Sequence, residues 1–203
     1  MVVSAETRGW ADESRRERAI AATPPFTSWP AAALQRLARA ARARRYAAGE
    51  VLCRQGARAD SVSILVLGSA ESSMSSADGR RIVLKLDAPG RAYGLVSMID
   101  RGALTNDMVA LEPSITLEIS CSAVRAELAA DPALWESVAR LLNMRSRYYL
   151  EQMRSFTLDS LPARAASLLL GLLEPAGRGA TGSVAIEFRL TQQRFAEMLG
   201  VTR

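Results

Sequence analysis

Side chains able to carry catalytic, metal or redox chemistry are scarce in this sequence. The chain has no histidine, which excludes histidine-ligated haem, histidine-containing zinc sites and a histidine general base. Its two cysteines, Cys53 and Cys121, cannot supply the four thiolates of an iron–sulfur cluster within one chain. No nucleophile–base or metal-ligand set is visible. We therefore expect no enzyme, no cofactor and two free thiols, with a redox role for either thiol as the alternative.

The charge of the chain is moderately basic. Of its 203 residues 49% are hydrophobic and 23% charged, the formal net charge is +5, and Lys85 is the only lysine among many arginines. This balance mildly favours an acidic partner. No apolar run is long enough to span a membrane, and the N-terminus lacks the apolar core of a signal peptide. The sequence predicts a cytoplasmic protein without a membrane partner.

The longest uninterrupted helical pattern covers residues 132–156. Pro132 suits the first position of a helix, Asp131 can cap it, and no Gly or Pro follows within it. Apolar and long side chains recur at alternating steps of three and four, the spacing of a coiled-coil seam. They are Trp135, Val138, Leu142, Arg145, Tyr149, Gln152 and Phe156. We expect a helix that joins two copies in a symmetric dimer. A long helix lying on its own domain's sheet is the alternative.

The pattern before this helix is that of a small antiparallel roll. Residues 1–23 are charged and lack a clear period, so we expect a flexible arm or a loose helix, followed by a short helix over residues 31–43. Strand patterns then alternate with turn residues, such as Asp78-Gly79 and Pro89-Gly90. The clearest strands cover residues 61–68, 71–76, 80–87, 107–112 and 114–120. A helix over residues 122–130 follows them.

Two stretches resemble the cyclic-nucleotide-binding roll of the Crp/Fnr family of bacterial regulators. Residues 49–71 read GEVLCRQGARADSVSILVLGSAE, and residues 77–99 read ADGRRIVLKLDAPGRAYGLVSMI. Their glycines suit roll corners, where positive φ or close backbone approach is needed. The resemblance continues through the long helix, which is the dimer interface in that family. It implies an α+β fold with an antiparallel β-roll, a long dimerisation helix and a winged helix-turn-helix.

The nucleotide anchor departs from the family pattern. Members that bind cyclic AMP carry Phe-Gly-Glu after the Pro-Gly turn, and Arg-Ser about ten residues later. The Glu accepts hydrogen bonds from the ribose, and the Arg pairs with the cyclic phosphate. In this sequence the matching segments are Tyr93-Gly94-Leu95 and Thr105-Asn106. Neither Leu95 nor Thr105 can replace the missing charge, so cyclic AMP is not expected to bind, unless a local shift brings in Arg101.

Because the resemblance holds without the nucleotide anchor, we expect this pocket to bind a less polar, unidentified effector. Its candidate lining residues are Gly94, Leu95, Val96, Met98, Thr105, Asn106 and Tyr149. The alternative is that these side chains simply fill the roll and no effector exists.

The end of the chain resembles the first part of a winged helix-turn-helix. An apolar helix over residues 163–173 and a strand over residues 184–190 precede the words LTQQRFAEMLGVTR, in which Gly200 supplies the turn. Candidate DNA contacts are Thr191, Gln192, Gln193, Thr202 and Arg203. The sequence stops one or two residues into the expected recognition helix, so we expect a truncated DNA-binding domain. The alternative is a protein that has lost DNA binding.

These observations divide the chain into an arm (1–23), a sensor roll (24–130), a dimerisation helix (131–157) and a partial DNA-binding domain (158–203). The resemblance implies a dimeric transcription regulator with a degenerate nucleotide pocket. Its partners would be its own copy, DNA in the full-length protein, and a small-molecule effector or RNA polymerase. A regulatory or dimerisation module that binds no DNA is the alternative, and the sequence downstream of Arg203 in the gene discriminates the two.

Overall fold

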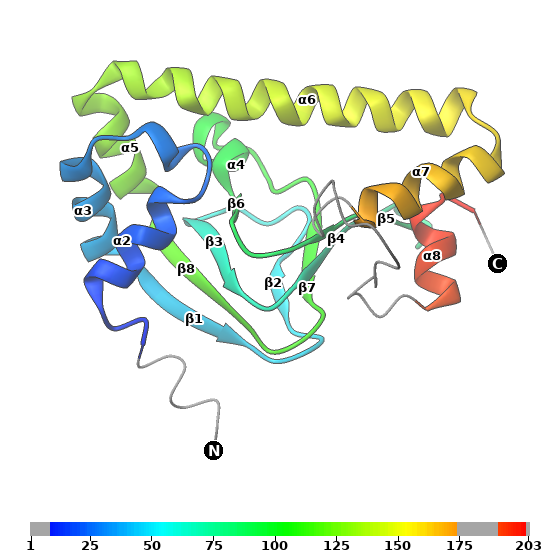
Figure 1. Ribbon diagram of the computed structural model, residues 1–203, viewed down its shortest axis with the longest axis horizontal. Helices are drawn as coiled ribbons and strands as arrows, with labels where there is room; N and C mark the ends of the chain where they lie inside the picture. The colour runs from blue at the N-terminus through cyan, green and yellow to red at the C-terminus, as the bar shows by residue number, and fades with distance from the viewer. Residues whose placement is uncertain (1–8, 174–190, 202–203) are drawn as a thin grey trace, which may run out of the picture.

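The structure is a computed structural model that describes residues 9–173 and 191–201. In this part of the chain two four-stranded antiparallel sheets form a roll (Figure 1). One sheet has the order β1-β8-β3-β6 and the other β2-β7-β4-β5. The strands are β1 Arg42–Tyr46, β2 Val51–Cys53, β3 Ser61–Leu67, β4 Ala70–Ser75, β5 Arg81–Asp87, β6 Arg91–Tyr93, β7 Asp107–Ala110 and β8 Ser114–Ser120. The expected α+β class with an antiparallel roll is confirmed.

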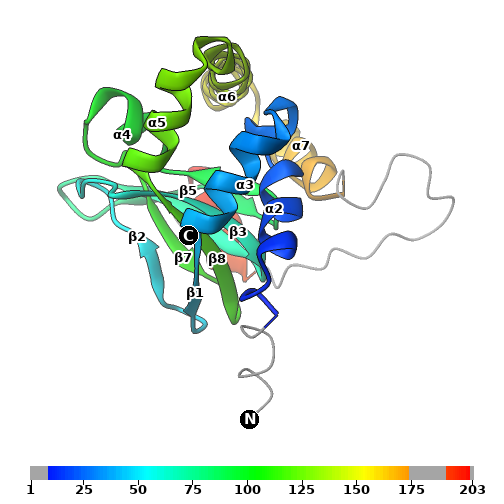
Figure 2. The same ribbon diagram turned by 90° about the vertical axis from the view of Figure 1, so that its left-hand side faces the viewer.

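The helices gather at one end of the roll and along its length. They are α2 Glu13–Ala21, α3 Ala31–Ala40, α4 Leu95–Asp100, α5 Cys121–Ala130, α6 Trp135–Leu158, α7 Leu161–Leu173 and α8 Gln192–Met198, with short 3-10 helices at Phe26–Ser28 and Pro132–Leu134. α2, α3 and α5 lie below the start of α6, and α6 runs past the roll to α7 and α8 (Figure 1). The end-on view in Figure 2 shows α6 above the roll rather than within it.

The strand β3 supplies both hydrophobic cores of the roll. Val62 and Ile64 are fully buried in the larger core, which α2, α3, α5 and the first turns of α6 also line. Leu65 turns to the second core, with Ala70 and Met108. This strand lies between β8 and β6, and it is paired on both sides. A central strand with apolar residues on both faces is what its near-continuous apolar sequence indicates.

Of the two expectations for the N-terminal segment, residues 9–23 show the helix and not the flexible arm. Asp12 accepts a hydrogen bond from the backbone N–H of Ser14 and so caps α2. Ile20 is fully buried, and Trp10 is almost so. Arg16 Nε donates to the carbonyl oxygen of Ala38 at 2.8 Å, which ties α2 to α3. Only a few apolar residues anchor this helix, so its sequence shows no clear period.

A helix stands where the sequence analysis assigned no element. α4 begins after Gly94, whose φ of 79° lies in the left-handed region. A Cβ at Gly94 would lie 2.5 Å from the carbonyl oxygen of Ser61, so this position needs glycine. α4 then turns Leu95 and Met98 inward, where they are 0% and 1% exposed.

The boundaries of the long helix differ slightly from the prediction. Asp131 accepts a hydrogen bond from the backbone N–H of Ala133 at 3.1 Å and caps the 3-10 helix Pro132–Leu134. α6 follows over Trp135–Leu158, so a single long helix at this place is confirmed. The predicted strand over residues 184–190 and the residues Thr202 and Arg203 lie outside the described residues.

Candidate functional site

A cavity of about 650 Å³ lies between the roll and α6. β4, β5 and β6 form one wall, α4 and the segment 103–108 form a second, and the middle turns of α6 form the roof. Its volume is that of an ordinary small-molecule site. The cavity is thus enclosed jointly by the roll and by the helix that leads to the C-terminal helices.

Six of the seven predicted effector-pocket residues line this cavity. They are Gly94, Leu95, Val96, Thr105, Asn106 and Tyr149. Met98 does not line it, because α4 turns its side chain into the larger core. The structure therefore brings the two segments around Gly94 and Thr105 together with α6, as the resemblance implies.

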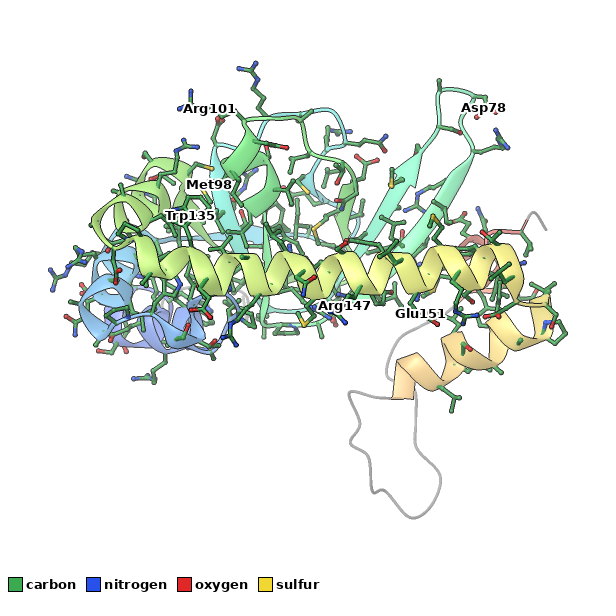
Figure 3. All side chains as sticks on the ribbon, turned by 90° about the horizontal axis from the view of Figure 1, so that it is seen from above. Asp78, Met98, Arg101, Trp135, Arg147 and Glu151 are labelled. Carbon is green, nitrogen blue, oxygen red and sulfur yellow. The ribbon has the colours of Figure 1, made fainter. Side chains whose placement is uncertain are left out.

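The side chains at the two anchor positions offer no charge to a cyclic nucleotide. Leu95 is fully buried. Thr105 is exposed, and its Oγ1 donates to Asn106 Oδ1 at 3.3 Å. Arg101 stands at the end of α4 with φ 58°, is exposed, and does not line the cavity. Figure 3 shows Arg101 at the edge of the molecule, away from α6.

A second part of the cavity, made by β5, β6 and α6 and called the cationic wall, is lined by charged side chains that were not predicted from the sequence. They are Lys85, Asp87, Arg91 and Arg145. The buried Asp87 carboxylate lies 2.9 Å from Lys85 Nζ and 3.6 Å from Arg91 Nε. It also accepts a 3.0 Å hydrogen bond from Ser72 Oγ. Arg145 reaches in from α6, and its Nη2 donates to the carbonyl oxygen of Ala92 at 2.6 Å.

This wall carries more positive than negative charge. Burial lowers the pKa of Lys85, although the nearby Asp87 carboxylate acts against this. Burial likewise lowers the pKa of Arg145. Among the described lining residues, three cations face a single carboxylate. The alternation of Lys85 and Asp87 along β5 places both on one face, which is the sequence signal that could have found them.

Two further polar groups border the cavity. Tyr93 lines it, and within the described residues its buried hydroxyl has no hydrogen-bond partner. Cys53 also lines it, and burial together with the Asp107 charge raises the pKa of its thiol to about 11. Cys53 and Cys121 are both free thiols.

The predicted dimer residues lie on one side of α6, and their own chain covers them to different extents. Val138 is 1% exposed in the core of its own chain, and Arg145 binds Ala92. Phe156 packs its ring against Gly200. These three side chains contact their own chain, and their place in a dimer seam stays a prediction. Gln152 is half-buried.

The mostly exposed apolar residues of α6 form a row that we call the outer stripe, and all of its members except Trp135 also border the cavity. The outer stripe consists of Trp135, Leu142, Tyr149, Leu150 and Met153, all of which are exposed except the half-buried Leu142. At 100° per residue these positions fall within about 100° of the helix circumference. In Figure 3, Met98 and Arg147 lie on opposite sides of α6. Arg147 therefore marks the polar side of the helix.

Ion pairs connect α8 with the roll. Arg81 on β5 pairs with Glu71 of β4 and, at 2.6 Å, with Glu197 of α8. Arg194 of α8 also pairs with Glu71, which is 3% exposed. Burial would lower the pKa of Arg81, but these carboxylates hold it above its ordinary value. The sequence analysis did not detect this contact, because its members lie far apart in the chain.

Three of the five predicted DNA-contact residues lie at the start of α8, and Thr202 and Arg203 lie outside the described residues. Thr191 caps this helix by accepting a 3.1 Å hydrogen bond from the backbone N–H of Arg194. Gln192 and Gln193 are exposed on its first turn. Gly200 follows α8 with φ 67°, as a turn there requires.

Comparisons with known proteins identify one domain and several relatives of this chain. Residues 43–131 match the family model of the cyclic nucleotide-binding domain. A CRP-like cAMP-activated global transcriptional regulator of Mycobacterium tuberculosis is 24% identical over 155 residues, covering 76% of this chain and 69% of the relative. The cAMP-activated regulator CRP of Pasteurella multocida is 22% identical over 160 residues, covering 78% and 76%.

Solved structures share the fold. The c-di-GMP-responsive global regulator CLP of Xanthomonas campestris superposes with a TM-score of 0.71 at 18% identity, covering 85% of this chain and 86% of that one. FixK2 of Bradyrhizobium japonicum gives 0.68 at 19% identity, covering 80% and 78%. Within the described residues no helix has the length and apolar character needed to cross a bilayer. Residues 43–131 thus match a cyclic nucleotide-binding domain, and the chain as a whole is similar to CRP-like transcriptional regulators.

Proposed function

We propose that this protein is a dimeric, DNA-binding transcription regulator whose cavity below α6 is an effector pocket that no longer takes cyclic AMP. The observation that carries the proposal is the position of the cavity. Its floor belongs to the roll and its roof to α6, which continues to α7 and α8. A ligand bound there contacts both parts at once, and can therefore shift one against the other.

Two relatives are named as cAMP-activated, but we do not propose cyclic AMP as the effector of this chain. Leu95 is buried and apolar, and Thr105 is exposed and neutral. A cyclic phosphate next to them would find no cation on that wall of the cavity. We also propose no haem and no iron–sulfur cluster, because the sequence lacks histidine and has two cysteines.

A second copy of the chain is the proposed occupant of the outer stripe. Monomeric proteins rarely expose a continuous row of large apolar side chains. Here Trp135 is 40%, Tyr149 50% and Met153 61% exposed. A straight helix offers the same row to its own copy in a two-fold arrangement, which is the commonest form of a homodimer. The stripe runs along the helix that roofs the effector pocket, so pairing and ligand binding share one element.

DNA is the proposed partner of the C-terminal helices. The formal net charge of +5 favours a polyanion. Thr191, Gln192 and Gln193 stand at the exposed start of α8, where a helix N-terminus can meet a backbone phosphate.

Chromatin immunoprecipitation tests the regulator function. The protein, tagged at its own gene in its own host, is expected to enrich discrete promoter sites that contain a palindrome, since a two-fold dimer reads two half-sites. Uniform recovery of the genome without such sites would contradict the proposal. That outcome would favour the module that binds no DNA.

A further inference from the structure

We infer that the effector pocket binds a phosphate monoester carried on an aromatic or apolar body, with the phosphate held by Lys85, Arg91 and Arg145. The inference rests on the proposed effector role of the same cavity and names the class of its ligand. It places the charged end of the ligand against the cationic wall of β5, β6 and α6, and not against the wall where Leu95 and Thr105 stand.

The first support is the charge left over on this wall. Lys85, Arg91 and Arg145 face the cavity together with the single carboxylate of Asp87 among the described lining residues. Two positive charges therefore remain uncompensated at the cavity. A phosphate monoester carries close to two negative charges above pH 7, whereas a cyclic phosphodiester carries one. The monoester therefore matches the surplus.

The second support is the kind of contact each cation now makes. Asp87 is shared between Lys85 and Arg91, at 2.9 Å and 3.6 Å. Arg145 donates its hydrogen bond to a neutral group, the carbonyl oxygen of Ala92. Burial lowers the pKa of both Lys85 and Arg145, so the protein environment alone does not satisfy their charge. Guanidinium groups suit phosphate oxygens in particular, because their N–H donors form a planar fork.

The third support is the lining around these cations. Tyr148 lies beside Lys85, with 5.9 Å between Nζ and the ring centroid. Leu142, Tyr149 and Met108 contribute further apolar and aromatic surface. The buried hydroxyl of Tyr93, unpartnered within the described residues, borders the same space. The pocket thus combines a cationic end with an aromatic and aliphatic body, and has the volume for both.

Isothermal calorimetry with 1-naphthyl phosphate tests this assignment. The probe joins a flat aromatic ring to a phosphate monoester, and 1-naphthol supplies the same ring without charge. At pH 8 we expect the chain to bind 1-naphthyl phosphate, and to bind 1-naphthol at least tenfold more weakly. The variants Lys85→Gln and Arg145→Gln should each weaken phosphate binding about tenfold or more, the range of one charge-assisted contact.

Arg147→Gln is the matched control. It removes an arginine from the same helix, two residues from Arg145, at an exposed position that does not line the cavity. It should leave the affinity unchanged. If circular dichroism shows that Arg145→Gln is unfolded, the Lys85→Gln variant provides the test, because Lys85 lies on β5 and not on α6.

Three results would overturn the inference: no binding of 1-naphthyl phosphate, equal binding of 1-naphthol, or unchanged affinity in both pocket variants. None of these measurements involves DNA. Their failure would reject the ligand class and leave the regulator function to the chromatin experiment. Conversely, a chain without promoter sites could still bind the probe.

Discussion

At the scale of single residues, two substitutions at the nucleotide anchor and four charged groups on the cationic wall define what the cavity can hold. Leu95 and Thr105 remove an acceptor and a cation from one wall. Lys85, Asp87, Arg91 and Arg145 place charge on the cationic wall. The preference for a ligand therefore follows from where the charges lie, since the roll itself is shared with relatives that are named for cyclic AMP.

Cyclic AMP should not bind the unaltered chain below about millimolar concentration. Burying its phosphate next to Leu95 and Thr105, without a cation there, costs several kcal/mol. The missing ribose contact costs about 1.5–3 kcal/mol more, and each 1.4 kcal/mol is about tenfold in affinity. Calorimetry measures this directly. The double variant Leu95→Glu, Thr105→Arg should gain affinity, while micromolar binding by the unaltered chain would show that other arginines serve the phosphate.

The Cys53 thiol should react slowly with iodoacetamide. Burial and the Asp107 charge raise its pKa from 9.0 to about 11, so at pH 8 its thiolate fraction falls about 100-fold. The higher nucleophilicity of a more basic thiolate recovers about tenfold, which leaves a rate about tenfold below that of the unfolded chain. The rate should rise with pH up to about 11. Mass spectrometry of alkylated Cys53 measures it, and a rate at pH 8 equal to that of the urea-unfolded chain would contradict the expectation.

At the scale of elements, the helix prediction for α6 is confirmed, and its dimer interface stays a prediction. The three-and-four spacing selects one side of the helix, whether or not its own chain covers each residue there. Val138, Arg145 and Phe156 contact their own chain, while Trp135 and Tyr149 are exposed. Sequence spacing reports that a helix has an apolar side, but only packing shows which of its residues its own domain already covers.

The ion pairs of Arg81 should hold α8 on the roll. Arg81→Gln removes the contact between β5 and Glu197. It also removes one of the two arginine partners of the buried Glu71, so that only Arg194 remains. Arg81 is 33% exposed at its side chain, so we expect a loss of roughly 1 kcal/mol of local stability, or about fivefold faster amide exchange in α8.

Hydrogen exchange followed by mass spectrometry measures the protection of α8 in this variant. Arg80→Gln is the control, since that side chain is 81% exposed and pairs with Asp78 at the neighbouring turn. Exchange in α8 that stays the same in Arg81→Gln and in the control would show that apolar contacts, such as that of Gly200 with Phe156, suffice to hold the helix.

At the scale of the whole molecule, the sequence predicted the roll and the long helix because both have strong local signals. Alternating strands and Asp78-Gly79 turns specify hairpins, and 24 residues without Gly or Pro specify α6. α4 was missed, and α2 was expected only as one of two alternatives, because short helices with a few anchors, Ile20 and Leu95 among them, lack a full period. The cationic wall of the cavity was missed because Lys85 and Arg145 meet only through tertiary packing.

A symmetric pair of chains is the central claim, because the proposed regulator joins its pocket and its C-terminal helices through one paired helix. Sedimentation velocity tests it most directly. The unaltered chain should sediment at twice its mass of 21.9 kDa, and the double variant Tyr149→Glu, Met153→Glu should sediment as a monomer. Arg147→Glu changes charge on the polar side of α6 and should stay dimeric. A monomeric unaltered chain, or a dimer that survives both stripe substitutions, would contradict the claim.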